Sequence, residues 1–199
     1  MIELPVEGQL DINGWDLRKA LRLLQKSNPP LLEWLGSPLV YREHSSVAVS
    51  LRSLAARYHS PRACAYHYLH MAQGNFREYL RGPEVWRKKY FYVLRPLLAI
   101  RWIERGLGVV PTEFPVLLER VVEGAPLLEA INELLREKRA GGELDRRLRI
   151  EAISAFIESE LARLESFELD LQGAQLPVTE LNRRRVKNPS KTPPPEFGG

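Results

Sequence analysis

The chain has 199 residues, 44% of them hydrophobic, which is enough to bury the core of one domain or of one domain with appendages. No apolar run approaches the roughly 18 residues of a membrane span, and residues 1–15 lack the basic flank and apolar stretch of a signal peptide. The single cysteine, Cys64, excludes an internal disulfide and a multi-cysteine zinc site. We therefore predict a cytoplasmic protein without a membrane segment.

The formal net charge of +4 and the pI of about 9.3 have a local origin. Residues 183–199 hold five basic side chains and one acidic side chain, so this segment accounts for the whole net charge. Residues 1–182 are neutral by formal charge, and any affinity of that part for nucleic acid must come from local patches. Because its last residues are basic and proline-rich, residues 171–199 are predicted to be a disordered tail.

The spacing of apolar residues predicts a mainly helical body after one short strand. Asp16 and Thr112 are predicted N-caps, and Pro96 is predicted to kink the helix that contains it. The predicted elements are a strand over 9–12, an extended segment over 38–42, and helices over 17–26, 29–36, 50–59, 61–82, 83–106, 114–122, 125–139 and 143–167.

One strand is not stable alone, so the strand over 9–12 is expected to belong to a sheet. The fold class is therefore mainly α, an α+β remnant in which the N-terminal strand of a truncated sheet precedes a helical bundle. We expect the other strands of this sheet to precede residue 1. The predicted division is 1–42 for the sheet remnant, 43–170 for the helical domain and 171–199 for the tail.

Asp11 lies between Leu10 and Ile12, and a carboxylate in an apolar setting is costly to bury unless a partner pairs with it. Two interpretations remain open from the residues alone: a metal ligand, or an aspartate in a turn or on the surface. Asp16 precedes a helical pattern and is better explained as a cap than as a ligand.

Three blocks of the sequence resemble the C-terminal two-thirds of nucleotidyltransferases in the DNA polymerase beta superfamily, in the group called the RNA repair pathway polymerase-beta family. The blocks are DINGWDLRKALRLLQKSNPPLLEWLGSPLVYRE (11–43), RYHSPRACAYHYLHMAQGNFREYL (57–80) and KKYFYVLRPLLAIRWIERG (88–106). The resemblance implies a small mixed sheet with a Gly-Ser turn and an Asp-x-Asp pair, a third carboxylate on a later strand, and a helical domain. It also implies two divalent metals, magnesium or manganese, bound by these acids, and it assigns Asp11 the catalytic and metal-binding role of the third carboxylate.

The sequence departs from this pattern at the acid pair. Gly36-Ser37 is followed by Pro38 and by no Asp-x-Asp, and the acid-x-acid pair Glu168 and Asp170 lies near the other end of the chain. A single carboxylate does not hold magnesium without partners. We therefore predict a catalytically incomplete chain that binds no metal alone, whether as a fragment or as a degenerate family member.

Basic and polar residues on the predicted helices are candidates for contacting a nucleoside triphosphate. A basic cluster with aromatic neighbours can hold phosphate and stack a base, although a solvated helix face and core aromatics are the ordinary alternatives. His67 and His70 share a spacing that permits a metal pair, but packing is the better interpretation because no HExxH pattern is present. The candidate binding residues are Lys88, Lys89, Arg95, Asn75, Arg77, Tyr79, Arg18 and Lys19.

Three functions remain as hypotheses. The resemblance implies transfer of a nucleoside monophosphate from a nucleoside triphosphate to a hydroxyl, with RNA as the acceptor, in the complete enzyme. The missing acid pair favours a non-catalytic helical module that binds RNA or a protein. A truncated sheet with an open edge would instead promote association of the chain with a second copy.

Overall fold

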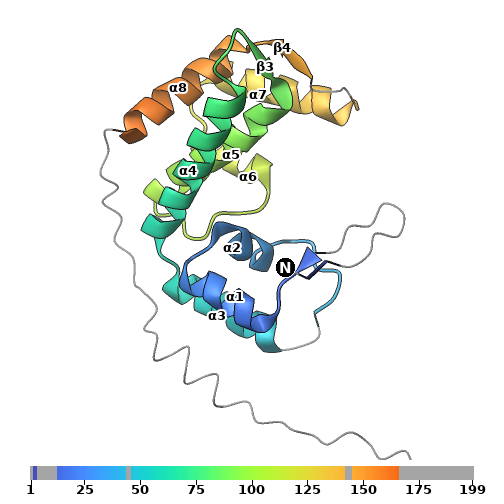
Figure 1. Cartoon of the computed structure of the whole chain (residues 1–199), viewed down its shortest axis with the longest axis vertical. Coiled ribbons are helices and arrows are strands. Elements are labelled where there is room, and N and C mark those ends of the chain that lie inside the picture. Colours follow the sequence, from blue (N-terminus) through green and yellow to red (C-terminus); the bar gives the residue numbers. More distant parts are fainter. Residues whose placement is uncertain (1, 4–12, 44–45, 142–144, 166–199) are drawn as a thin grey trace, which may run out of the picture.

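The computed structural model describes residues 2–3, 13–43, 46–141 and 145–165, and these residues form a mainly helical protein, as predicted (Figure 1). They contain eight helices and two small antiparallel sheets of two strands each. The elements are β1 (Ile2–Glu3), β2 (Asn13–Gly14), α1 (Leu17–Gln25), α2 (Pro29–Leu35), α3 (Ser46–Tyr58), α4 (Pro61–Tyr79), β3 (Glu84–Trp86), α5 (Arg87–Glu104), α6 (Phe114–Val121), α7 (Ala125–Arg139), β4 (Arg146–Leu148) and α8 (Glu151–Glu165).

The first three helices form one end of the molecule (Figure 1). Asp16 caps α1, as predicted, and its carboxylate accepts a hydrogen bond of 2.9 Å from the Lys19 backbone N–H. That bond lowers the pKa of Asp16. Asn28 caps α2 in the same way, and Pro29 occupies the first turn, where its missing N–H costs nothing. The α2 helix packs against α1 and α3.

The long helices α4 and α5 make the most extensive helix–helix contact and form the axis of the molecule. The α4 helix runs from the α1–α3 cluster to the opposite end, where β3 turns the chain back into α5 (Figure 1). α5 also packs against α6 and α8 and has apolar residues on all sides. Its Tyr90, Val93, Leu94, Leu97 and Leu98 have no exposed surface, which explains why its pattern is apolar nearly all round. The helix continues through Pro96.

Two predicted helices are wrong at their N-terminal ends. The segment predicted to open a helix at Pro83 forms β3, and part of the segment predicted as a helix from 143 forms β4. The strands pair antiparallel, with Val85 opposite Arg147 and Trp86 opposite Arg146. Val85 is 1% exposed, so pairing and burial between segments about 60 residues apart override the local pattern.

Thr112 is not the cap of α6, contrary to the prediction. The N-cap is Glu113, which makes no side-chain capping bond. The Thr112 hydroxyl instead donates a hydrogen bond of 2.8 Å to the carbonyl oxygen of Glu33 in α2. This bond ties the loop before α6 to the α1–α3 cluster. The predicted strand over 9–12 and the predicted tail over 171–199 lie outside the described residues.

Candidate nucleotide-binding site

The predicted site residues do not gather in one place. Arg18 and Lys19 are exposed in the first turn of α1, whereas Lys88 and Lys89 lie in the first turn of α5. Figure 1 shows α1 and the start of α5, directly after β3, at opposite ends of the molecule. Asp11 lies outside the described residues. The remaining candidates fall into three separate environments on α4 and α5.

The Arg95 guanidinium is occupied by the protein itself. It forms an ion pair of 3.0 Å with Glu33 Oε2 and donates hydrogen bonds of 3.0 Å each to the carbonyl oxygens of Pro111 and Thr112. Glu33 Oε1 accepts a hydrogen bond of 2.5 Å from the Tyr68 hydroxyl. Burial and the Glu33 carboxylate raise the pKa of Tyr68. This network joins α2, α4, α5 and the loop before α6, so Arg95 connects the α1–α3 cluster to the α4–α5 pair.

Lys89 has a different environment at the start of α5. Its ammonium lies 4.0 Å from the ring centroid of Tyr79 and 4.7 Å from that of Tyr92, and it makes no ion pair with any described residue. Aromatic faces attract a cation without neutralising its charge. The two rings therefore hold this ammonium in place and leave its charge available to an anion.

The surroundings of Lys89 are partly exposed and carry further polar groups. Tyr92 is 47% exposed and Lys88 is exposed, whereas the neighbouring Tyr90 is core and its hydroxyl bonds Ser154 Oγ at 2.7 Å. A hydrogen bond with the Glu78 carboxylate raises the pKa of Tyr79. We call these four residues, Lys88, Lys89 and Tyr92 on α5 and Tyr79 on α4, the Lys89 cluster.

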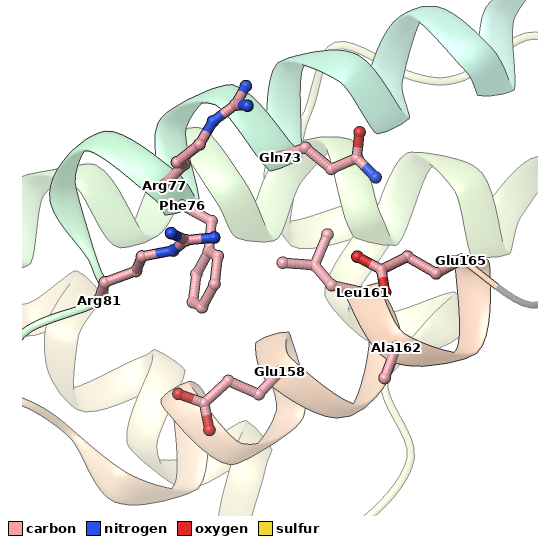
Figure 2. A pocket seen from close by; sticks show the side chains of 8 residues that line it. All are labelled: Gln73, Phe76, Arg77, Arg81, Glu158, Leu161, Ala162 and Glu165. Atoms are coloured by element: carbon pink, nitrogen blue, oxygen red, sulfur yellow. The ribbon is translucent and has the colours of Figure 1, made fainter.

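Arg77 lies on another face of α4. Successive helical residues are about 100° apart, so Arg77 and Tyr79 point to nearly opposite sides. Asn75 shares the Tyr79 face at a spacing of four residues, and its side chain donates to the Met71 carbonyl at 2.9 Å. Arg77 instead lines an open pocket of about 390 Å³ between α4 and α8 (Figure 2). The other lining residues include Gln73, Phe76, Arg81, Glu158, Leu161 and Glu165.

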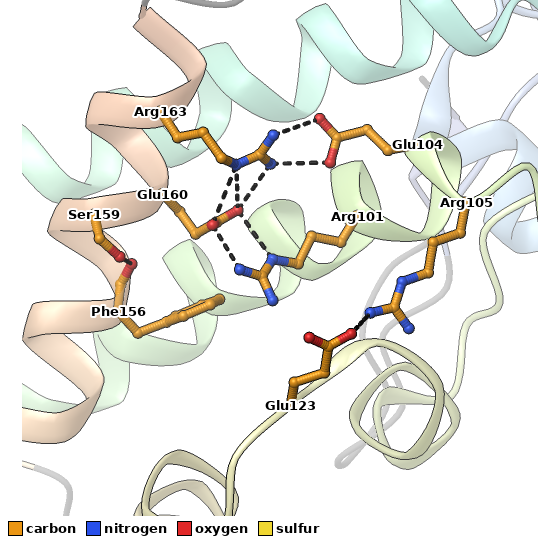
Figure 3. A network of polar contacts seen from close by, with 8 residues as sticks. All are labelled: Arg101, Glu104, Arg105, Glu123, Phe156, Ser159, Glu160 and Arg163. Atoms are coloured by element: carbon orange, nitrogen blue, oxygen red, sulfur yellow. Dashed lines mark hydrogen bonds and ion pairs between the residues drawn. The ribbon is translucent and has the colours of Figure 1, made fainter.

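A cluster of ion pairs that the sequence did not indicate fixes α8 to α5 (Figure 3). Arg101 and Arg163 both bind Glu160, at 2.6 and 2.9 Å, and Arg163 also binds Glu104 at 2.9 Å. Burial alone would raise the pKa of Glu160, but the hydrogen bonds from the two arginines outweigh it and lower that pKa. The two arginines and two glutamates of this cluster neutralise one another, and their ion pairs hold α8 against α5.

The described residues do not fit a magnesium site. They contain no group of three or more His, Cys, Asp or Glu side chains placed to hold a metal ion, and the carboxylate of Asp16 is used as a cap. Cys64 is buried, as predicted, and its thiol donates to the Ser27 carbonyl at 3.2 Å.

The comparisons with known proteins show the family of this mainly helical chain. The model of the RNA repair pathway DNA polymerase beta family matches residues 1–187, and the chain belongs to this family. It is 47% identical over 184 residues to an uncharacterized protein, YcgL, of Bacillus subtilis (strain 168), over 92% of this chain and 71% of the relative. No solved structure matches the chain.

Membership relates the chain to nucleotidyltransferases, and the polymerase beta superfamily typically uses magnesium. Among the described residues, none of the helices is long and apolar enough to cross a lipid bilayer.

Proposed function

We propose that these residues supply the nucleotide-binding helical part of a nucleotidyltransferase that moves a nucleoside monophosphate from a triphosphate to a hydroxyl of RNA. Family membership supports the reaction class. The observation that carries the site is the Lys89 ammonium, held over two tyrosine rings with no carboxylate partner among the described residues. An unneutralised, positioned cation is what a triphosphate needs from a helical domain.

In this proposal Lys88 and Lys89 contact the phosphates and Tyr92 offers its exposed ring to the base. Stacking on an aromatic ring tolerates any base, because every base has a π-face. The Tyr79 ring lies 4.0 Å from the Lys89 ammonium and positions that ammonium for phosphate. Arg95 acts through the fold, because its donors already bind Glu33, Pro111 and Thr112.

The proposal also covers Asp11 and the division of the chain into three parts. Asp11 is the third carboxylate, and the chain divides into 1–42, 43–170 and 171–199. The 199 residues contain no Gly-Ser turn followed by Asp-x-Asp, so we propose that they do not transfer nucleotides by themselves. Arg18, Lys19 and Asn75 stay predicted contacts of the complete enzyme. Arg18 and Lys19 lie on α1, away from the Lys89 cluster.

Nucleotide binding by the 199-residue chain tests the site. Lys88→Ala/Lys89→Ala is expected to weaken the binding of ATP by about tenfold or more, since each lysine is assigned a charge-assisted contact with phosphate. Lys138→Ala is the matched control, because Lys138 also lies over an aromatic ring, that of Phe91 at 5.0 Å, on another helix. ATP affinities are measured by calorimetry on folded proteins. Equal affinities of the double variant and the control would show that the triphosphate does not bind at this site.

A transfer assay separates the proposal from its alternative, a non-catalytic module that binds RNA or a protein. The specific observation favouring the alternative is the missing acid pair after Gly36-Ser37. The chain is incubated with labelled nucleoside triphosphates, RNA and magnesium or manganese. We expect no transfer together with measurable ATP binding. RNA binding without ATP binding would favour the module, and efficient transfer would contradict the incomplete site.

A further inference from the structure

The pocket between α4 and α8 is separate from the Lys89 cluster and has its own chemistry (Figure 2). Both helices pack against α5, and the pocket lies in the gap between them. Its volume of about 390 Å³ falls within the range of ligand pockets, which starts near 300 Å³. Phe76 and Leu161 provide apolar surface, and Gln73 provides an amide.

The two arginines of this pocket are not paired with its glutamates. Arg77 and Arg81 are exposed and make no ion pair with any described residue. Glu158 is already paired, because Arg149 binds it at 3.1 Å from outside the pocket. Glu165 pairs with no basic side chain among the described residues, and its carboxylate turns toward the pocket in Figure 2. The lining therefore carries two arginines and two glutamates, and the two arginines are the cations left for an anion, which suits one phosphodiester better than a triphosphate.

We propose that this pocket binds a nucleotide of the acceptor RNA strand. Arg77 and Arg81 contact one backbone phosphate, and the base lies against the Phe76 ring with Gln73 at its edge. Glu165 accepts a hydrogen bond from the ribose 2′-hydroxyl, the group by which a protein distinguishes RNA from DNA. That this RNA is the acceptor rests on the proposed function. The donor nucleotide and the acceptor strand would then bind on opposite sides of α4.

The test uses fluorescence anisotropy with a labelled single-stranded RNA of twelve nucleotides and the 199-residue chain. Arg77→Ala/Arg81→Ala is expected to bind about tenfold more weakly and to lower the salt slope of log K by about 0.7, for one lost phosphate contact. Arg62→Ala is the matched control, an exposed arginine at the other end of α4 whose guanidinium lies over Tyr66. Its affinity is expected to stay at that of the unchanged chain.

Three further arms sharpen the result. Every variant is also measured with Arg183, Arg184 and Arg185 changed to Ala, so that charge of residues 183–199 does not mask the pocket. Phe76→Leu keeps apolar volume but loses the stacking ring, and it is expected to weaken binding by about fivefold. DNA of the same sequence is expected to bind more weakly than RNA, and Glu165→Ala is expected to abolish that difference. Circular dichroism confirms that each variant is folded; Arg81→Gln replaces the double variant if the latter unfolds.

The outcomes divide clearly. Equal RNA affinity of the double variant and the Arg62 control, or no RNA binding by the chain at all, overturns the proposal. Loss of ATP binding instead of RNA binding in Arg77→Ala/Arg81→Ala assigns the pocket to free nucleotide and overturns the acceptor assignment. Equal binding of RNA and DNA overturns the role of Glu165. Failure of the proposed function is seen separately, because it depends on ATP and on Lys88 and Lys89.

Discussion

The two ends of the α4–α5 pair use cations in opposite ways. Near α2, Arg95 binds one carboxylate and two carbonyl oxygens, and the Glu33 carboxylate is shared with Tyr68. Near β3, the Lys89 ammonium lies over two tyrosine rings and pairs with no carboxylate of a described residue, and Arg77 lines a pocket. A cation whose donors are all used holds the fold together, whereas one without an acidic partner is available to a ligand.

This contrast shows that residues 1–182, although neutral by formal charge, still carry basic side chains that make no ion pair with a described residue. In the α5–α8 cluster, the charges of Arg101 and Arg163 are neutralised by ion pairs with Glu104 and Glu160 (Figure 3). Beside β3, Arg87 also pairs with Glu137, whereas Lys89, Arg77 and Arg81 make no ion pair with a described residue. Local pairing, rather than the number of basic residues, decides where phosphate can bind.

The largest expected effect comes from the buried member of the α5–α8 cluster. Glu160 is 3% exposed, and Glu160→Gln leaves Arg101 without a charged partner and Arg163 with Glu104 alone. We expect the free energy of unfolding at pH 7 to fall by about 3 kcal/mol, the usual cost of breaking a buried pair from one side. Urea unfolding followed by circular dichroism measures this loss.

The same residue gives the chain a pH dependence with a defined sign. The pKa of Glu160 is lower in the folded state than its ordinary value, so the stabilisation is present above that ordinary value and is lost as pH falls through the folded pKa. In Glu160→Gln this contribution is absent at every pH. The stability curves of the two proteins are expected to converge as the pH is lowered below about 4, and parallel curves would contradict the prediction.

Arg95→Ala sharpens the comparison between the two ends of the pair. The side chains of Arg95 and Glu33 are 24% and 17% exposed, so we expect a loss of about 2 kcal/mol, less than for a fully buried pair. Arg95→Lys restores little of it, because an ammonium does not reproduce the planar fork that reaches Glu33, Pro111 and Thr112. Arg139→Ala, an exposed arginine of α7, is the control. Unchanged stability of Arg95→Ala with weaker ATP binding would return Arg95 to the nucleotide site.

Tyr68→Phe removes one hydrogen bond from the same network and leaves Glu33 paired with Arg95. We expect a smaller loss in the free energy of unfolding, about 1 kcal/mol. A double-mutant cycle with Arg95→Ala tests whether the two residues act through Glu33. Additive losses would contradict a shared network, because residues that meet at one carboxylate are expected to couple.

The helices were predictable from the sequence because their signals are local. Asp16 and Asn28 cap α1 and α2, and the apolar positions of α5 are buried, as their spacing indicated. The β3–β4 pair was not predictable, since Val85 becomes a strand residue only when Arg147 arrives to pair with it. Thr112 was misjudged for the same reason, because its partner Glu33 lies 79 residues away.

The candidate site divides along the same line. The sequence placed Asn75, Arg77 and Tyr79 on one helix, which α4 confirms, and made all three candidate nucleotide contacts. Their two-residue offset already implied opposite faces, since two helical steps turn the chain by about 200°. The pairing of Arg95 with Glu33 had no local signal, because the two residues are 62 positions apart and meet only when α2 packs beside the α4–α5 pair.

The smallest expected effect is on the chemical reactivity of Cys64, which lies at the end of α4 near α2. Burial raises the pKa of its thiol to about 12, and its Sγ donates to the Ser27 carbonyl. Only a thiolate attacks a thiol reagent efficiently, so the native chain is expected to react slowly with such a reagent at pH 8 and rapidly once urea unfolds it. Cys64→Ser is the control for reaction elsewhere. Arg95→Ala is expected to speed the labelling, because it loosens the network beside α2 and raises the fraction of opened molecules. Rapid labelling of the unaltered native chain would contradict this buried environment and favour a reactive cysteine.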